Sequence, residues 1–219
     1  MMRLSCFGGN PNIGVYSVAN ESLAIISPDA SEEYVRTVEG AMGVNALLTT
    51  VAGSFVVGSL VAMNSGCAVV SGLAEEAEVE RISKEIPVYV LHSRYNAAGN
   101  NILVNDHGAI VNPNMDDRNL EGLEKALGVR CVRSMIAGMD TVGSACKATN
   151  KGAVCHPKTS TQEAELIERV LNVEVKRTTL NHGSGLLGPC LLANSKGAVV
   201  GDITTPIEMG KLEDALNLF

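Results

Sequence analysis

The sequence predicts an α/β protein made of five repeats, each in the order strand, strand, helix, strand. Glycines recur with spacings of 44, 41, 44 and 45 residues, and a turn centred on an asparagine follows each glycine. A signal for the start of a helix and an amphipathic segment come next, so the spacing of the apolar residues changes from that of a strand to that of a helix within every repeat. The two series are Gly14, Gly58, Gly99, Gly143 and Gly188, and Asn20, Asn64, Asn105, Asn150 and Asn194.

The first two strands of a repeat form a hairpin, which the third repeat shows most clearly. Residues 102–104 (ILV) and 109–111 (AIV) are apolar and flank the segment 105–108 (NDHG). Asn, Asp and Gly tolerate the positive φ angles that tight turns require. The pattern therefore predicts two antiparallel strands joined by a short turn.

The helix of each repeat begins at a residue that can cap it. Three segments place a capping residue three positions before a glutamate, a pattern typical of helix N-termini. The apolar positions that follow, such as Ala164, Ile167 and Leu171, recur at helical spacing. The three predicted starts are Asp29–Glu32, Ser160–Glu163 and Thr205–Glu208, the last with Pro206 in the first turn.

An extended segment after each helix supplies the third strand, at residues 44–51, 88–91, 129–136 and 173–180. The fifth repeat has no such segment, because its helix runs to Phe219. The chain begins instead with a strand-like segment, residues 3–7. We expect this N-terminal strand to complete the last repeat and close a ring, which removes exposed sheet edges.

The repeats predict a single domain whose units follow one another along the chain. The predicted boundaries are approximately 10–53, 54–94, 95–138, 139–183 and 184–219, and the N-terminal strand lies within 1–9.

Composition narrows the possible modes of binding. The net charge is −7, there is no Trp and there are only three Phe. This composition disfavours binding of nucleic acid by phosphate neutralisation or by base stacking. The N-terminus lacks the apolar run of a signal peptide, which predicts a cytoplasmic protein. The uncharged stretch 40–74 is interrupted by Gly53, Gly58, Gly66 and Gly72 and by several Ser, Thr and Asn, so it is interpreted as buried strands and not as a membrane span.

No catalytic or metal-binding pattern stands out. The six cysteines form no Cys-x-x-Cys pair and are interpreted as reduced, buried hydrophobic residues. Residues 183–188 spell G-x-G-x-x-G, but the segment 189–193 after them is predicted to be a strand, which disfavours a dinucleotide site. The glutamates between 75 and 85 match a solvated helix face. A third of the dispersed basic residues could meet RNA if the ring presents them together. The dispersed residues are Arg130, Arg133, Lys147, Lys151, Lys158, Lys176 and Arg177.

Four stretches resemble the translation initiation factor 6 family in order and spacing, and the resemblance extends over essentially the whole chain. They are residues 7–15 (FGGNPNIGV), 98–102 (AGNNI), 152–160 (GAVCHPKTS) and 181–184 (NHGS). The resemblance implies the pentein fold, a five-bladed α/β propeller. It also implies a monomer that binds the large ribosomal subunit and thereby prevents association with the small subunit. The contacts implied are a ribosomal protein at the intersubunit face and the neighbourhood of the sarcin-ricin loop.

The resemblance implies no cofactor, no metal and no catalysis. It points to the archaeal form, because the chain ends directly after the fifth helix without the tail of eukaryotic members. Two alternatives stay open. Other penteins are enzymes that act on guanidino groups with a nucleophilic cysteine and a histidine, although no histidine here lies in a His-x-Asp or His-x-Glu pattern. A closed ring can also serve as an interaction scaffold that does not bind ribosomes.

The loops around the five glycines are the candidate binding surface, because equivalent loops of a ring emerge at the same end. The alternative is that they are tight turns only. Asn100 is the strongest candidate, since a short amide both donates and accepts hydrogen bonds. This chain has Ser59 at a position where the resemblance leads us to expect an arginine in eukaryotic members. The candidate ribosome-binding residues are Asn12, Phe55, Ser59, Asn96, Asn100, Asp140, Ser144 and Ser184.

Overall fold

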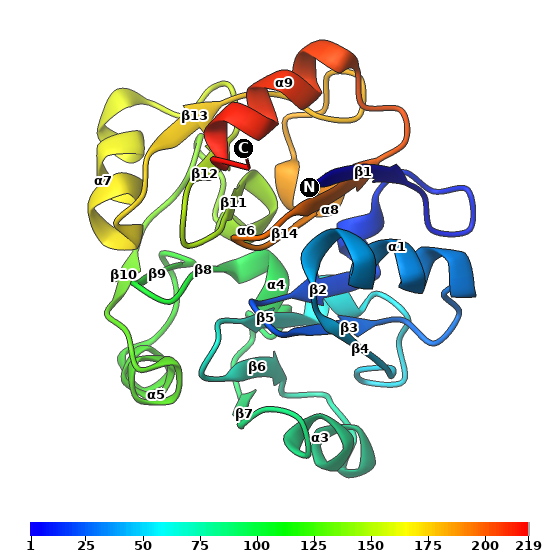
Figure 1. The fold of residues 1–219 in the computed structure, drawn as a ribbon. Coiled ribbons are helices and arrows are strands. Elements are labelled where there is room, and N and C mark those ends of the chain that lie inside the picture. Colours follow the sequence, from blue (N-terminus) through cyan, green and yellow to red (C-terminus); the bar gives the residue numbers. More distant parts are fainter. Residues whose placement is uncertain (219) are drawn as a thin grey trace.

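The computed structural model describes residues 1–218 and shows five three-stranded sheets arranged around a central axis (Figure 1). In every sheet the middle strand pairs with one antiparallel and one parallel neighbour. In units 1 to 4 a helix connects the middle strand to the parallel strand, whereas in unit 5 the helix follows the middle strand and the parallel strand comes from the N-terminus. These five helices form the rim of the ring. The predicted five-unit α/β architecture is confirmed.

The elements follow the same order in each unit. Unit 1 contains η1 (Ile13–Val15), β2 (Ser17–Ala19), β3 (Leu23–Ile26), α1 (Glu32–Met42) and β4 (Asn45–Leu48). Unit 2 contains α2 (Val57–Leu60), β5 (Val61–Met63), β6 (Ala68–Ser71), α3 (Glu76–Ser83) and β7 (Val88–Leu91). Unit 3 contains α4 (Ala98–Asn101), β8 (Ile102–Val104), β9 (Ala109–Val111), α5 (Asp117–Leu127) and β10 (Cys131–Arg133). Unit 4 contains α6 (Val142–Ala145), β11 (Cys146–Ala148), β12 (Ala153–Cys155), α7 (Thr161–Leu171) and β13 (Val175–Arg177). Unit 5 contains α8 (Leu187–Cys190), β14 (Leu191–Ala193), β15 (Ala198–Gly201) and α9 (Pro206–Ala215), and its third strand is β1 (Met2–Ser5).

The N-terminal strand closes the ring as predicted. β1 lies parallel to β15, in register from Met2 opposite Ala198 to Ser5 opposite Gly201. The two ends of the sequence therefore meet in one sheet (Figure 1). Phe7, which follows β1, stacks on Tyr16 with 4.3 Å between ring centroids and so ties the closing strand to unit 1.

The asparagine turns both shape the hairpins and join neighbouring units. Asn20 Oδ1 accepts hydrogen bonds from the backbone N–H groups of Ser22 (2.9 Å) and Leu23 (2.8 Å), which forms the turn. Its Nδ2 donates to the carbonyl of Asn64 in the next unit (2.8 Å). One side chain thus satisfies buried backbone groups of two units.

The predicted turn residue of unit 4 is wrong by one position. Thr149, not Asn150, occupies the equivalent place, since its Oγ1 accepts from the N–H groups of Lys151 (3.1 Å) and Gly152 (3.3 Å). A threonine hydroxyl can accept these two bonds, so the turn keeps its shape without an amide. Asn150 instead bonds to Asp106 (2.6 Å) in the neighbouring turn.

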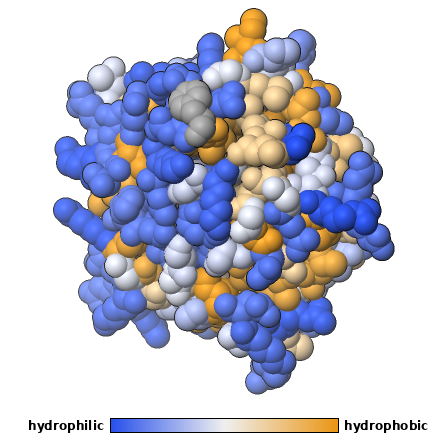
Figure 2. Space-filling view, in the orientation of Figure 1, coloured by the Kyte–Doolittle hydropathy of each residue, from blue (hydrophilic) through white to orange (hydrophobic). Residues whose placement is uncertain are grey.

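Two of the three predicted helix starts are confirmed by capping boxes at Ser160 and Thr205, and Pro206 begins α9. The start of α1 differs, because Ser31 and not Asp29 is the N-cap and accepts from the N–H of Tyr34 (3.2 Å). The helices bury one face against the sheets, as Ile167 and Leu171 of α7 show. Hydrophilic side chains dominate the outer surface over α7 in Figure 2.

The uncharged stretch 40–74 forms the end of α1, followed by β4, α2, β5 and β6, in agreement with the strand interpretation. Within residues 1–218 none of the helices combines the length and the apolar character needed to cross a membrane.

Candidate functional site

The five repeat glycines lie in single helical turns and not in the loops that the sequence suggested. Each turn packs on the next around the axis. A Cβ atom on Gly58 would lie 2.0 Å from the carbonyl oxygen of Gly14, and one on Gly99 would lie 1.9 Å from that of Gly58. The chain of contacts continues through Gly143 (2.1 Å) and Gly188 (2.1 Å) and closes where Gly14 meets the carbonyl of Gly188 (2.0 Å). Close approach of the backbones, and not an unusual φ angle, therefore requires glycine here.

The two ends of the ring differ in the groups they present. We call the end that carries the five short helices the glycine end, and the opposite end, with the turns at Asn20, Asn64, Asn105, Thr149 and Asn194, the asparagine end. The first strand of each unit runs from the glycine end to the asparagine end. The second and third strands run back, so the loops after them also lie at the glycine end.

Three candidate residues surround the mouth of the central cavity at the glycine end. Ser59 and Asn100 directly follow two of the ring glycines and line this cavity. The Ser144 hydroxyl, one unit further on, donates to Asn100 Oδ1 at 3.3 Å. Asn100 keeps partial exposure and a free Nδ2 among the described residues, so its amide faces the surface with one donor unused.

The other candidates lie further from the mouth and have different surroundings. Asp140 is exposed and accepts from Asn114 Nδ2 at 3.0 Å. Asn12 Oδ1 accepts from Asn181 Nδ2 at 3.4 Å, which links unit 1 to the loop before unit 5. Ser184 holds its own loop, because its Oγ accepts from the N–H of Leu186 at 3.3 Å. Asn96 is partly buried and lines a shallow pocket of unit 3, and Phe55 is 45% exposed.

Exposed apolar side chains lie at the same end, and apart from Phe55 they were not identified from the sequence. Leu73 follows β6 and Ile203 follows β15, and their side chains are 66% and 52% exposed. Met135, Leu186 and Phe55 add further apolar surface between third strands and short helices. The sequence signal that could have identified Leu73 and Ile203 is an apolar residue shortly after a predicted strand and next to turn residues. Apolar groups concentrated at one end of a molecule are typical of a contact surface.

Tight hairpins between the third strands and the short helices are held by buried acids. Glu78 of α3 accepts from the N–H of Ala52 (2.6 Å), the N–H of Gly53 (3.0 Å) and the hydroxyl of Thr50 (2.6 Å). Glu78 is therefore no part of a solvated face, in contrast to the interpretation of its acidic segment. Burial alone would raise the pKa of Glu78, but these hydrogen bonds, with that of Glu75, lower it below its usual value.

Glu208 of α9 plays the same part in unit 5. Its carboxylate accepts from the N–H of Gly183 (2.8 Å), the N–H of His182 (3.2 Å) and the hydroxyl of Thr179 (2.7 Å). Burial acts to raise its pKa, but the hydrogen bonds from Thr205, Thr179 and Gly183 outweigh it and lower the pKa to about 2. These loops are therefore fixed to the rim helices.

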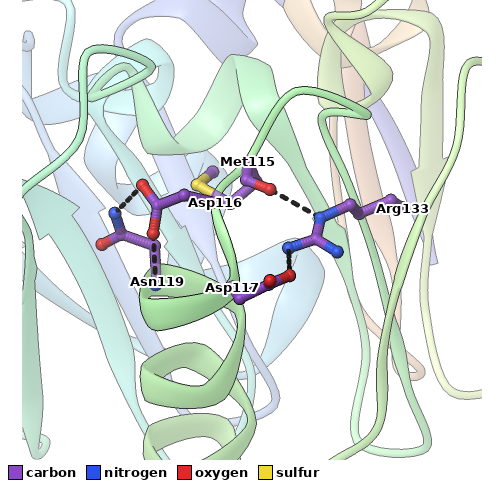
Figure 3. A network of polar contacts seen from close by, with 5 residues as sticks. All are labelled: Met115, Asp116, Asp117, Asn119 and Arg133. Carbon is purple, nitrogen blue, oxygen red and sulfur yellow. Dashed lines mark hydrogen bonds and ion pairs between the residues drawn. The ribbon is translucent and has the colours of Figure 1, made fainter.

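A third polar network fixes the glycine end of unit 3 (Figure 3). Arg133 of β10 donates through Nε to the carbonyl of Met115 (2.5 Å) and forms an ion pair with Asp117 (2.6 Å). Asp116 caps α5 by accepting from the N–H and the Nδ2 of Asn119 (2.8 and 2.7 Å). The network positions the segment before α5, whose Asn114 contacts the candidate Asp140.

The basic residues do not form one shared RNA-binding face. Besides Arg133, Arg177 donates to the carbonyl of Thr159 (2.6 Å), and Lys176 forms an ion pair with Asp214 (2.5 Å). Lys147 lines the central cavity. Four of the seven basic residues that the sequence singled out thus act within the fold. Arg133 and Arg177 contact the start of the helix of their own unit, and Lys176 contacts the helix of the next unit. β11 places Lys147 at the axis.

The surroundings of the buried cysteines are unfavourable for nucleophilic catalysis. Burial raises the pKa of the Cys131 thiol to about 12 and raises those of Cys67, Cys146, Cys155 and Cys190, whereas a nucleophilic cysteine needs a lowered pKa. Residues 1–218 contain no group of three or more His, Cys, Asp or Glu side chains placed to hold a metal ion. Gly188 of the G-x-G-x-x-G segment lies within the single-turn helix α8. The segment after it was predicted to be all strand, but β14 begins only at Leu191.

Comparison with known proteins agrees with this architecture. A sequence model of the eIF-6 family matches residues 2–215. Translation initiation factor 6 of Methanosphaerula palustris is 40% identical over 98% of this chain and 97% of its own length. That of Methanoculleus marisnigri is 42% identical over 94% of each chain, and that of Pyrococcus horikoshii is 35% identical over 96% of each chain.

The match extends from β1 to the end of α9 and therefore includes every unit of the ring and the strand that closes it. Relatives that are 35–42% identical cover nearly the full length of both chains. The chain therefore belongs to the eIF-6 family.

Proposed function

We propose that this protein binds the large ribosomal subunit through its glycine end and keeps the small subunit from joining it. The eIF-6 family and the relatives named translation initiation factor 6 support a role in translation initiation. The bound surface of the subunit is its intersubunit face, where a ribosomal protein lies near the sarcin-ricin loop. A ring placed there occupies space that the small subunit needs.

The observation that carries the proposal is the combination of exposed apolar and neutral polar groups at one end of a rigid ring. Leu73, Ile203 and Phe55 supply apolar area, and Asn100 supplies an amide with an unused donor. Acids of the rim helices hold the intervening loops in place. A surface organised before binding loses little conformational entropy when it docks.

The charge of the protein favours a protein component over bare RNA as the main contact. The net charge is −7, and several basic residues are engaged within the fold. Such a surface gains little from the release of counterions around RNA phosphates. We infer that apolar contacts and neutral hydrogen bonds to a ribosomal protein dominate, with RNA contacts at the edge.

The proposal includes a monomer without a cofactor that acts in the cytoplasm. The raised pKa values of the buried cysteines support a binding protein over a guanidino-modifying enzyme. The enzyme alternative predicts turnover of arginine or agmatine together with one hyper-reactive thiol. The scaffold alternative predicts that neither ribosomal subunit is bound.

Sedimentation through a sucrose gradient tests the proposal. The protein is mixed with purified large and small subunits from an archaeon. It should migrate with the large subunit and reduce the fraction of joined particles. A variant with Phe55→Ala and Leu186→Ala should bind more weakly, whereas His107→Ala, exposed at the asparagine end, should behave as the unchanged protein. Migration with neither subunit would refute the proposal.

A further inference from the structure

A lysine replaces an apolar residue at one position of the five-unit pattern. Lys147 of β11 lies two residues before the turn residue Thr149. The equivalent residues of the other first strands are all buried and apolar: Val18, Ala62, Leu103 and Leu192. Lys147 is the exception in a ring that is otherwise consistent, and the subunit-binding surface described above does not account for it.

Lys147 lines the cavity on the axis of the ring. This cavity has a volume of about 50 Å³ and is bordered by residues of all five units, from the ring glycines down to the first strands. Such a volume holds roughly three or four water molecules. Lys147 is its only charged lining residue among those described, and the others are small, apolar or neutral polar.

The backbone adds a hydrogen-bond donor beside the lysine. Thr149 donates to Gly152 and His156 donates to Ala145 across the β11–β12 pair. Because hydrogen-bonded pairs alternate in an antiparallel ladder, the N–H of Ala148 points away from β12, toward the axis. Ala148 also lines the cavity. A donor that faces an enclosed space needs a partner there.

The structure provides no counter-charge for the ammonium group. Among residues 1–218, Lys147 Nζ takes part in none of the ion pairs or side-chain hydrogen bonds. The carboxylates of Glu21 and Asp106 border a neighbouring cavity at the asparagine end, and both are engaged with Ser195, Ser65 and Asn150. Lys147 is only partly exposed, and a protonated amine withdrawn from bulk water is costly unless an opposite charge accompanies it.

Lys147 keeps its proton under neutral conditions. Burial lowers its pKa to about 8, which still lies above pH 7. The only other titratable group acting on it is the adjacent thiol of Cys146, whose own pKa burial raises. The amine is therefore a cation inside a narrow cavity for most molecules at pH 7.

We propose that the central cavity binds one small monovalent inorganic anion of halide size, held by the ammonium group of Lys147 and the N–H of Ala148. A halide is close in size to a water molecule and fits the available volume. Larger polyatomic anions fit less well, because the cavity offers a volume of only about 50 Å³. The anion completes the charge balance at the junction of units 4 and 5 and stabilises the ring.

Bromide serves as the probe, in thermal melts at pH 7 and constant ionic strength. Sodium gluconate is replaced stepwise by sodium bromide, since gluconate is too large for the cavity. The melting temperature of the unchanged protein should rise with the logarithm of the bromide concentration above the dissociation constant, and the rise should be about 3–6 °C when bromide is ten times that constant. Lys147→Met should lose this rise, because methionine fills the site without a charge. Lys151→Met, which removes the same charge from an exposed position nearby, should keep it.

Diffraction from crystals soaked in bromide locates the ion independently of stability. An anomalous peak beside Lys147 Nζ in the unchanged protein, absent from Lys147→Met, supports the proposal. An equal bromide response in all three proteins overturns it, as does a cavity that contains only water in the soaked crystal. The diffraction experiment decides the question even if Lys147→Met fails to fold, because it uses the unchanged protein.

Discussion

A methyl group is the smallest change that tests the ring of glycines. In Gly99→Ala the new Cβ would lie 1.9 Å from the carbonyl oxygen of Gly58 and 2.7 Å from that of Val61, so backbone atoms of two units must move. We expect a loss of roughly 3 kcal/mol or more in the free energy of unfolding, measured by urea denaturation.

Gly40→Ala is the matched control for this substitution. Gly40 lies within α1, is exposed, and has no atom within 4 Å of an added Cβ. Alanine there should stabilise the protein by about 0.5–1 kcal/mol through helix propensity. Equal unfolding free energies for the two variants would show that the glycine turns do not pack as closely as described.

Asn100 tests the binding surface at the same scale. Asn100→Ser should leave the melting temperature nearly unchanged, because the only side-chain hydrogen bond of Asn100 among the described residues is the 3.3 Å contact with Ser144. Binding to the large subunit should weaken by about 1–3 kcal/mol, as for the loss of a central interface contact. Melting and sedimentation are measured on the same protein.

Ser144→Ala separates the two roles of Asn100. This variant removes the internal hydrogen bond and leaves the amide of Asn100 in place. Its affinity for the subunit should fall less than that of Asn100→Ser, because only the Ser144 hydroxyl is lost. If Asn100→Ser lowers the melting temperature and affinity together, the residue holds the turn and does not contact the partner.

At the scale of elements, one carboxylate connects a rim helix to the loop that precedes the short helix of the same unit. Glu208 accepts hydrogen bonds from the start of α9 and from the loop at His182 and Gly183, and its pKa is lowered to about 2. A group whose folded pKa lies below its unfolded value stabilises the fold above the unfolded pKa. That contribution is present above about pH 4.5 and is lost as the pH falls toward 2.

Glu208→Gln should therefore lower the free energy of unfolding by on the order of 2–3 kcal/mol at pH 7. The difference from the unchanged protein should shrink as the pH falls from 4.5 toward 2, which denaturant titration at several pH values measures. Glu165→Gln, an exposed carboxylate on α7, should show little effect at any pH. A difference for Glu208→Gln that does not depend on pH would contradict the hydrogen-bonded carboxylate.

At the scale of the whole molecule, stability depends on closing the ring. Removal of residues 1–8 deletes β1, which exposes one edge of β15, and deletes Phe7, which packs against Tyr16 and Tyr34. The truncated chain should lose cooperative thermal unfolding, measured by calorimetry. A synthetic peptide of residues 1–8 added in excess should restore part of the transition, whereas a scrambled peptide should not. A truncated chain that melts like the full protein would show that closure is dispensable.

Local patterns were enough to determine the sheet strands and the long helices with their order, but not the five single-turn helices, which were expected as loops. The hairpin of β8 and β9 and the capping boxes at Ser160 and Thr205 depend on residues within about ten positions of each other. Backbone hydrogen bonding and apolar periodicity act over that range, so the sequence displays them directly. The missing final strand even predicted the pairing of β1 with β15, because a repeat pattern shows what is absent.

The tertiary structure alone decided how residues from different units meet. Glu78 has the spacing of a solvated residue, yet its partners at Thr50, Ala52 and Gly53 lie 25–28 positions earlier in the chain and bury it. Thr149 replaces an asparagine because a hydroxyl can accept the same two bonds.

The gathering of Leu73, Ile203 and Phe55 at one end, and the enclosure of Lys147 on the axis, likewise required the ring to be built. The sequence by itself determined the periodic units, because each is shaped by interactions within one repeat. The two ends, the central cavity and the burial of single polar groups were decided by contacts between repeats, which no local pattern contains.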